Sequence, residues 1–418
     1  MRGLEWTPEQ VELRDAVRAV LTRHPGHEAW APLTAQVGAA ALAVPEEYGG
    51  LGCGPAEVGV VMSELGRALS PVPYLGSAVL TVQALLAAGH AESCTKHLPL
   101  LAEGSLVGAL AWAEPPRGGP DGGAAPGAAP GAASRPHADA GAGRGAGPFA
   151  NPGPRPEGWE AAHMATLAEP DGDGWLLTGS KQYVLAGPAE PGLVLVFATM
   201  ANGPAPSHTS GQDSATTPAA QGNGTAGPLG LFELTAPPTA YTARATMDRT
   251  RPLAELTLDR TPARLLSPDG AGVLARVRDL ACTALAAEQA GAAARALEST
   301  VRYAKDRHQF GRPIGSFQAV KHRLADMYAA VESARSMALA AAAADAPPHL
   351  AAAAKSACSQ AYSYVAGEMI QLHGGIGITW EHEAHEFFKR AHGSALLFGS
   401  PAAHRARLAA QLDYTRAT

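Results

Sequence analysis

The sequence lacks the features of a membrane or secreted protein. Its 418 residues contain no apolar run that approaches the ~20 residues of a membrane-spanning helix. The first six residues carry no long apolar stretch, so no signal peptide is expected. The four cysteines lie far apart and form no CxxC pair, which predicts reduced, mostly buried thiols. We therefore expect a cytoplasmic protein without membrane insertion.

Concentrated charge of one sign is also absent. The net charge is -6, and the Lys and Arg residues are scattered instead of forming basic blocks. Nucleic acid is therefore not an expected partner. What the sequence does have is length and apolar content. A chain of 418 residues with 46% hydrophobic residues exceeds the usual size of one core, which predicts two or three domains.

The first third of the chain has helical patterns. Thr7-Pro8-Glu9-Gln10 matches a capping box, with Pro at the first helical position. A further helix is expected from about Val58 to Leu69, ended by Ser70-Pro71. These patterns predict an N-terminal helical domain over residues 1–106.

After Leu106, short apolar runs alternate with turn residues, which indicates strands. Asp171-Gly172-Asp173-Gly174 is typical of a hairpin turn. Two stretches, 116–157 and 202–227, are dominated by small residues and Pro, and we expect them to be disordered insertions. The middle β domain is predicted over 107–265. The expected strands lie at Trp175–Leu177, Leu193–Phe197, Leu229–Leu234 and Leu253–Leu258.

The last part of the chain, 266–418, is predicted to be a four-helix bundle. Its long apolar periods have few interruptions, which is typical of packed helices. The order of helices, strands and helices predicts an α+β fold with the β domain in the middle. The expected helices are Val273–Lys305, Phe317–Ala344, His349–Leu372 and Glu381–Leu397.

Two runs in the bundle combine residues suited to a phosphate-bearing ligand. In the run 302–318, Arg307 offers a fork of donors, Phe310 an apolar face and Gly311 a close turn. The run Gln371–Gly377 ends a helix in a glycine turn, whose backbone N–H groups can approach an anion. Taken alone, each run is also typical of an ordinary helix end.

Together the two runs resemble the C-terminal signatures of the acyl-CoA dehydrogenase family. The resemblance implies that the middle domain is a β-barrel or sandwich. It implies FAD as cofactor and removal of two hydrogens from the α and β carbons of an acyl-CoA thioester. It also implies FAD sites shared between subunits of a dimer or dimer of dimers, and an electron-transfer flavoprotein as electron acceptor. The residues that it places at FAD are Arg307, Gln309, Phe310, Gln318, Gln371, Gly374 and Gly375.

The middle domain departs from the family pattern around the flavin ring. Ala113 in the run Ala111–Pro115 stands where the family has a hydroxyl residue, and Leu185 stands where it has Thr. Tyr183 takes the place of a flavin-stacking Trp. The resemblance therefore implies the loss of two polar flavin contacts. Trp112 and Tyr183 are equally well explained as ordinary strand residues.

The reaction needs a carboxylate within ~3 Å of the α-proton. The resemblance places this base at Gly399 or at Ala281, and neither position carries a carboxylate. Glu288 lies seven residues after Ala281 on the same side of the helix, which makes it the candidate base. The alternative is a helix-face carboxylate paired with Arg. Cys282 replaces a family Arg near the substrate, and Asp279 matches a family Asp there.

Three functions remain open at this point. The first is an active FAD-dependent dehydrogenase with an unusually placed base. The second is a subunit of a heterotetramer, in which a second acyl-CoA dehydrogenase chain carries the Glu and this chain completes the flavin site. The string 373–382 is similar to actinobacterial members that form such α2β2 assemblies. The third is a non-catalytic scaffold. No metal site is predicted, because His382 and His385 are expected to be solvated.

Overall fold

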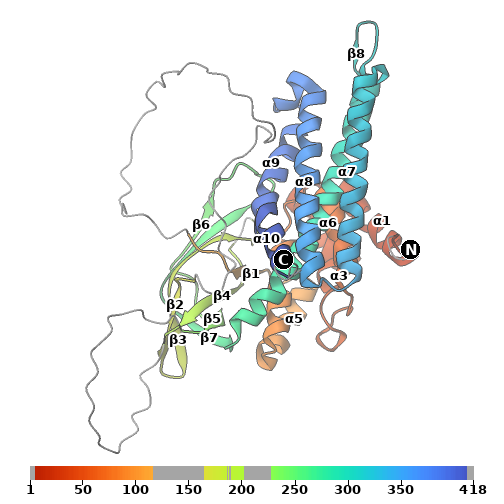
Figure 1. The fold of residues 1–418 in the computed structure, drawn as a ribbon. Helices are drawn as coiled ribbons and strands as arrows, with labels where there is room; N and C mark the ends of the chain where they lie inside the picture. Colours follow the sequence, from red (N-terminus) through yellow and green to blue (C-terminus); the bar gives the residue numbers. More distant parts are fainter. Residues whose placement is uncertain (1–4, 116–163, 186, 188–189, 202–226, 412–418) are drawn as a thin grey trace, which may run out of the picture.

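A computed structural model describes residues 5–115, 164–185, 187, 190–201 and 227–411 (Figure 1). The predicted insertions at 116–157 and 202–227 lie outside these residues, apart from residue 227. Helices precede and follow the strands along the chain, which confirms the predicted α+β order. In Figure 1 the strands lie on one side of a larger body of helices.

The N-terminal region is helical and begins with the predicted capping box. The Gln10 backbone N–H donates to the Thr7 hydroxyl at 3.3 Å, and the Thr7 N–H donates to Gln10 Oε1 at 3.1 Å. One segment, η4, is a π-helix, a rare form that is frequent at functional sites. The helices are α1 (Pro8–Arg23), η1 (Gly26–Ala29), α2 (Trp30–Val37), η2 (Ala39–Ala41), η3 (Glu46–Tyr48), α3 (Pro55–Arg67), η4 (Leu75–Thr81), α4 (Val82–Ala88) and α5 (Ala91–Glu103).

The middle region forms a closed barrel. Strand β5 pairs with both β7 and β4, so β4, β2, β3, β7 and β5 make a ring, with β1 added to β4 and β6 to β7. The hairpin predicted at Asp171–Gly174 joins β2 to β3. The strands are β1 (Gly108–Ala111), β2 (Leu167–Asp171), β3 (Gly174–Val184), β4 (Leu193–Met200), β5 (Leu229–Leu234), β6 (Ala240–Arg244) and β7 (Leu253–Ser267).

A buried carboxylate joins the barrel to α5. Glu233 on β5 accepts hydrogen bonds from Ser93 Oγ at 2.8 Å and Arg264 Nη2 at 3.0 Å, and it lies 2.9 Å from His97 Nε2. Burial alone would raise the pKa of Glu233, but the hydrogen bonds of His97, Ser93 and Arg264 lower it to about 2. This charged contact fixes the N-terminal helices against the barrel.

The C-terminal region is the predicted helical bundle, and α6 (Gly270–Asp306) runs through its centre, packed on α3, α7 and α8. Helices α3 and α6 cross in backbone contact, since a Cβ added to Gly66 would lie 2.1 Å from the Glu288 carbonyl oxygen. The remaining elements are β8 (His308–Gln309), β9 (Arg312–Pro313), η6 (Ile314–Ser316), α7 (Gln318–Ala343), α8 (Pro348–His373), η7 (Gly374–Ile378), α9 (Ala384–Leu396) and α10 (Pro401–Gln411).

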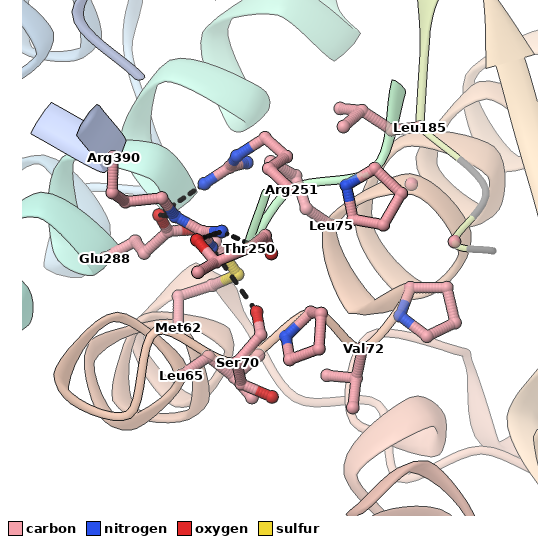
Figure 2. Close-up of a pocket in the computed structure, with 15 residues that line it drawn as sticks. Met62, Leu65, Ser70, Val72, Leu75, Leu185, Thr250, Arg251, Glu288 and Arg390 are labelled. Carbon is pink, nitrogen blue, oxygen red and sulfur yellow. Dashed lines mark hydrogen bonds and ion pairs between the residues drawn. The ribbon is translucent and has the colours of Figure 1, made fainter. Parts of the chain in front are cut away.

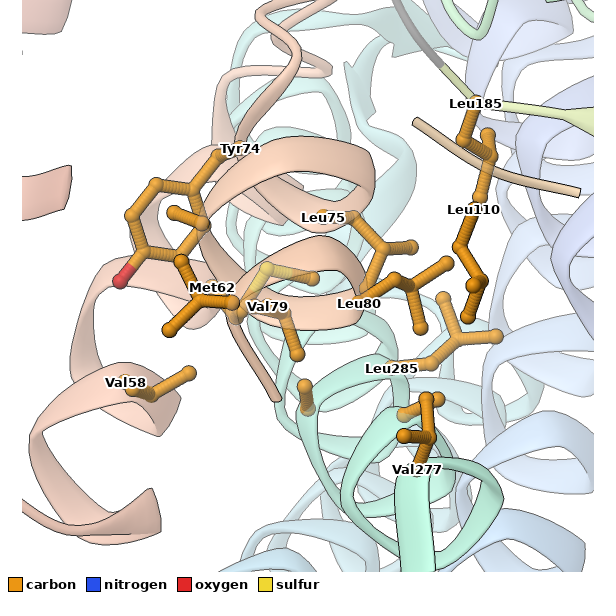
Figure 3. Packing of buried hydrophobic residues seen from close by; sticks show 14 of the residues in the cluster. Val58, Met62, Tyr74, Leu75, Val79, Leu80, Leu110, Leu185, Val277 and Leu285 are labelled. Atoms are coloured by element: carbon orange, nitrogen blue, oxygen red, sulfur yellow. The ribbon is translucent and has the colours of Figure 1, made fainter. Parts of the chain in front are cut away.

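One apolar core continues from the N-terminal helices into the barrel and α6. Figure 3 shows Leu75 and Leu80 of η4 beside Leu285 of α6, with Leu110 and Leu185 of the barrel region close to them. All four cysteines carry free thiols. None of the described helices combines the length and the apolarity that crossing a bilayer requires.

Candidate functional site

The first sequence motif forms the tip of the bundle. Arg307 ends α6, and the chain then makes the two-stranded hairpin of β8 and β9, which projects beyond the helices in Figure 1. Phe310 and Gly311 form its turn with φ of +52° and +77°. The Phe310 side chain is 92% exposed, and its ring meets the edge of Phe317 at 6.1 Å. A strained, exposed aromatic is typical of a binding element.

The second motif lies at the same end of the bundle. Gly374 ends α8 with φ +64°, and η7 follows directly. The Tyr303 hydroxyl of α6 donates to the His373 carbonyl oxygen at 3.2 Å, and the two rings stack at 4.3 Å. The structure therefore brings the two motifs together across the ends of α6 and α8. The seven candidate cofactor residues are all exposed: Arg307, Gln309, Phe310, Gln318, Gln371, Gly374 and Gly375.

In the barrel, the run Ala111–Pro115 ends β1 and faces β3. Glu114 accepts a hydrogen bond from the fully buried Lys181 ammonium at 2.6 Å and from the Thr166 backbone N–H at 2.8 Å. Burial would raise the pKa of Glu114, but Lys181 lowers it overall. Burial also lowers the pKa of Lys181 to about 8. The ion pair holds the strand ends together, a role for Lys181 that sequence reasoning missed.

The residues expected near a flavin ring differ in their surroundings. Tyr183 has φ +56° and is 46% exposed, whereas Leu185 is buried in the core. The backbone at Leu185 is in close contact with Gly76 of η4. A Cβ added to Gly76 would lie only 1.7 Å from the Leu185 carbonyl oxygen. Trp112 is buried and its ring lies 5.5 Å from that of Phe398. The aromatic packing links the barrel to the segment after α9.

The two positions where the resemblance places the base are closely packed. Ala281 is fully buried in α6. Gly399 has φ +104°, and a Cβ added there would lie 3.0 Å from His404 Nε2. That nitrogen donates to the Phe398 carbonyl oxygen at 2.9 Å and lies 3.7 Å from Cys282 Sγ. A carboxylate at 399 would therefore meet an imidazole instead of open space.

A buried ammonium supports the same segment. Lys355 of α8 is fully buried and donates to the carbonyl oxygens of Ala395 at 3.1 Å and Gly399 at 3.3 Å, and to Ser359 Oγ at 3.0 Å. It thereby caps the C-terminal end of α9 with a positive charge. Burial lowers the pKa of Lys355 to about 8 and that of His404 to about 4, and it raises that of Cys282 to about 11.

Asp279, the predicted substrate residue, is buried and already paired. Arg407 Nη2 of α10 donates to its carboxylate at 2.6 Å, and Arg278 Nε lies 3.4 Å away. The structure therefore places Asp279 between the start of α6 and the C-terminal helix.

Glu288, the candidate base, lies in a buried ion cluster (Figure 2). Arg390 Nε donates to its carboxylate at 3.0 Å, and Arg251 is a second partner. Burial would raise the pKa of Glu288, but Arg251 and Arg390 lower it overall. Arg390 also donates to the Thr250 and Ser70 carbonyl oxygens at 2.8 and 3.4 Å. The alternative interpretation of Glu288, a carboxylate paired with Arg, therefore agrees with the structure, in which Arg251 and Arg390 both pair with it.

The adjoining cavity measures about 30 Å³, enough for one or two water molecules but not for an acyl chain. Sequence reasoning missed Arg251 and Arg390. Arg390 sits among Phe387, Ala391 and Ser394 on the buried face of α9, and a charge on such a face signals a buried ion pair.

The histidines after η7 do not converge on one point. The His382 ring lies 4.4 Å from that of His373 in a tilted arrangement, whereas the His385 ring meets that of Trp380 edge-on at 4.6 Å. Within the described parts of the chain, no group of three or more His, Cys, Asp or Glu side chains could hold a metal ion.

Comparison with protein families gives two matches. Residues 7–105 match the model of the acyl-CoA dehydrogenase N-terminal domain, and residues 269–412 match that of the acyl-CoA dehydrogenase C-terminal domain. The matches cover the two helical regions that flank the barrel.

Two similar proteins match most of the chain. The acyl-CoA dehydrogenase IpdE2 of Mycobacterium tuberculosis is 38% identical over 388 residues, which cover 92% of this chain and 87% of the relative. IpdE2 of Mycolicibacterium smegmatis is 34% identical over 403 residues, covering 95% and 93%.

Solved structures share the whole fold. A variant of the steroid ACAD Tcur3481-Tcur3483 is 29% identical with a TM-score of 0.73, covering 98% of this chain and 99% of that one. The ChsE4-ChsE5 complex from Mycobacterium tuberculosis is similar in fold, with a TM-score of 0.75 at 24% identity and coverages of 99% and 100%.

Proposed function

Because the chain belongs to the acyl-CoA dehydrogenase family, as its two C-terminal motifs predicted, we propose that it completes the FAD site of a partner acyl-CoA dehydrogenase chain. In this role it contributes to FAD-dependent α,β-dehydrogenation of an acyl-CoA thioester without supplying the base. The observation that carries the proposal is a contrast. The cofactor motifs are exposed at one end of the bundle, whereas both expected base positions are packed against other side chains.

The exposed end of the bundle fits the adenosine diphosphate part of FAD. Arg307 can pair with a phosphate, and Phe310 can cover an apolar face. Gly374 and Gly375 leave room for a ligand beside the backbone, since a Cβ added to either would meet nothing within 4 Å. The Gly374 N–H itself donates to the Ile370 carbonyl oxygen. Gln309, Gln318 and Gln371 add amide groups at the same end. FAD, when bound, accepts the hydrogen that leaves the β carbon of the acyl group.

The flavin-ring half of the site within this chain fits less well. Leu185 and Ala113 offer no hydroxyl, and the Leu185 segment is in contact with η4. Trp112 and Phe398 pack together beside Gly399. These contacts support a chain that lends residues to a neighbour's flavin more than one that holds a complete flavin site.

An active dehydrogenase with Glu288 as base is the alternative, and the geometry disfavours it. A general base works best with a pKa near the working pH. Burial alone raises the pKa of Glu288, but two guanidiniums lower it below its ordinary value, which weakens it as a proton acceptor. The adjoining cavity is also too small for an acyl group.

The partner that we propose is a second acyl-CoA dehydrogenase chain that carries the catalytic Glu, in a heterotetramer. One of the similar solved structures is the ChsE4-ChsE5 complex, which supports a heteromer. The exposed Phe310, Ile378 and Trp380, 92%, 72% and 68% exposed, offer apolar area for such a partner. We further propose an electron-transfer flavoprotein as the next electron acceptor.

Co-expression with a neighbouring dehydrogenase-like gene, followed by measurement of the flavin-to-chain ratio, tests the proposal. We expect one flavin per two chains in the co-purified complex and little flavin in this chain alone. A yellow homo-oligomer of this chain that reduces an electron acceptor with acyl-CoA substrates would overturn it.

A further inference from the structure

A second cavity, of about 310 Å³, borders α6 and shares no lining residue with the cavity at the ion cluster. Arg276, Leu280 and Ala284 recur every four residues and form the stripe of α6 that lines it. Glu288 lies one turn further along the same stripe but lines the other cavity, and Ala281 lines neither of the two. The cavity is therefore separate from the positions considered for the flavin and the base.

The walls of this cavity are mostly apolar and come from α3, η4, α4 and α6, from the chain on either side of η3 and from the turn after α7. Small side chains at Ala43, Ala78 and Ala284 leave the space open between α3, η4, α4 and α6. The π-helix η4 contributes Ala78 and Val79, and such segments are frequent at functional sites. The other apolar wall residues are Pro45, Pro55, Val58, Leu86 and Leu280.

Polar groups gather at one rim of the cavity. Arg276 donates to the carboxylate and to the carbonyl oxygen of Asp345, both at 3.0 Å. Asp345 and Ala346 have φ of +60° and +52°, so this turn between α7 and α8 is held in a strained form. Gln83 of α4 also lines the cavity, and its amide can donate and accept. The rim is therefore polar but without net charge.

We propose that this cavity binds an apolar small molecule with one uncharged hydrogen-bonding group, a hydroxyl or a carbonyl, placed at Gln83. The volume lies at the lower end of the range for small-molecule sites. Water fits the walls poorly, because a bound water needs two to four polar partners. An anionic head group is disfavoured because Asp345 neutralises Arg276. The site does not depend on the proposed role in FAD binding.

Titration of the full-length chain with the neutral fluorophore 1-aminoanthracene tests the site. We expect one saturable site with a dissociation constant on the order of 10–100 µM, from which decan-1-ol displaces the dye. Ala284→Phe places a ring in the cavity and weakens binding at least tenfold. Ala402→Phe, on the exposed surface of α10, is the matched control and leaves binding unchanged.

Further measurements separate the possible outcomes. If Ala284→Phe fails to fold in a thermal unfolding test, Leu86→Trp at the half-buried wall must give the same loss. Decanoate is expected to displace the dye at least tenfold less well than decan-1-ol, and Gln83→Leu to weaken decan-1-ol several-fold. The proposal would be overturned if dye binding did not saturate up to about 1 mM, or if Ala284→Phe and Leu86→Trp bound the dye unchanged. Stronger displacement by decanoate than by decan-1-ol would also overturn it.

Discussion

Two stretches of the same helix, α6, meet opposite surroundings. Ala281 and Glu288, in its first half, are buried among side chains from the other regions of the chain. Arg307, at its end, opens an exposed hairpin. Burial at the first stretch leaves no room for substrate, whereas exposure at the second leaves polar groups free to bind. Under the proposed function, one chain can therefore keep the residues that contact FAD while lacking a usable base position.

The contrast between the two stretches is tested most strongly at Glu288. We expect Glu288→Gln to lower the free energy of unfolding by about 3–5 kcal/mol, because Arg251 and Arg390 would lose their buried counter-charge. Chemical denaturation measures this loss. Glu298→Gln on the same helix is the control, since its half-exposed pair with Arg67 contributes about 0–1 kcal/mol. A Glu288→Gln protein that keeps its stability and flavin but loses turnover would identify Glu288 as the base.

At the other end of α6 the expected effect falls on the cofactor. Arg307→Ala in the co-expressed complex should weaken FAD binding on the order of 10- to 100-fold, through loss of a charge-assisted contact to phosphate. The unfolding temperature of the flavin-free chain should stay the same, because the side chain is exposed. Flavin absorbance after dialysis measures the effect, with Arg302→Ala, also exposed, as control. Equal flavin retention in both variants would contradict the assignment.

Restoring the family carboxylate should not restore a base. We expect Gly399→Glu to leave this chain inactive and to lower its stability by about 1–3 kcal/mol, because φ is +104° and His404 Nε2 lies 3.0 Å from the new Cβ. Gly89→Glu is the control. Its φ of +65° gives the same kind of backbone strain, but nothing lies within 4 Å of the new Cβ, so the variant lacks the crowding. Thermal unfolding should show the smaller loss for Gly89→Glu. Acyl-CoA oxidation by Gly399→Glu alone would contradict the packed geometry.

The smallest effect at neutral pH concerns the contact between α5 and the barrel. The pKa of Glu233 is lowered to about 2 from an ordinary value of 4.5. Its contribution to stability is therefore full above about pH 4.5 and is lost as the pH falls toward 2. Unfolding measured across this range should show the loss, and Glu233→Gln should remove this part of the pH dependence. An unchanged pH profile in that variant would show that other carboxylates dominate.

Local patterns predicted the elements well. The period of α6, predicted for Val273–Lys305, is observed over Gly270–Asp306, and the hairpin at Asp171–Gly174 is where its turn residues placed it. Both follow from short-range rules of capping, periodicity and turn chemistry. The cofactor motifs are also local, so the sequence alone could single them out, although their use in binding FAD stays a prediction.

The surroundings of the base positions depend on distant contacts, and the sequence could not predict them. Glu288 meets Arg251, 37 residues away, and Arg390, 102 residues away. The crowding at Gly399 depends on the backbone angle of a single glycine and on the placement of His404. The cavity beside Arg276 exists because Ala43, Ala78 and Ala284, small residues distant in the chain, lie close together in space. Such coincidences are set by packing of the whole chain.

The hairpin of β8 and β9 has a consequence for the lifetime of an assembly. Hydrogen bonds from Arg307 N–H to the Tyr303 carbonyl and from Ile314 N–H to the Arg307 carbonyl, both 2.8 Å, close its base. The Arg312 guanidinium stacks over the Phe317 ring at 4.1 Å. A loop that is ordered before association loses little conformational entropy on docking. We therefore expect slow dissociation of the subunits, so that chains exchange rarely between complexes once they have formed.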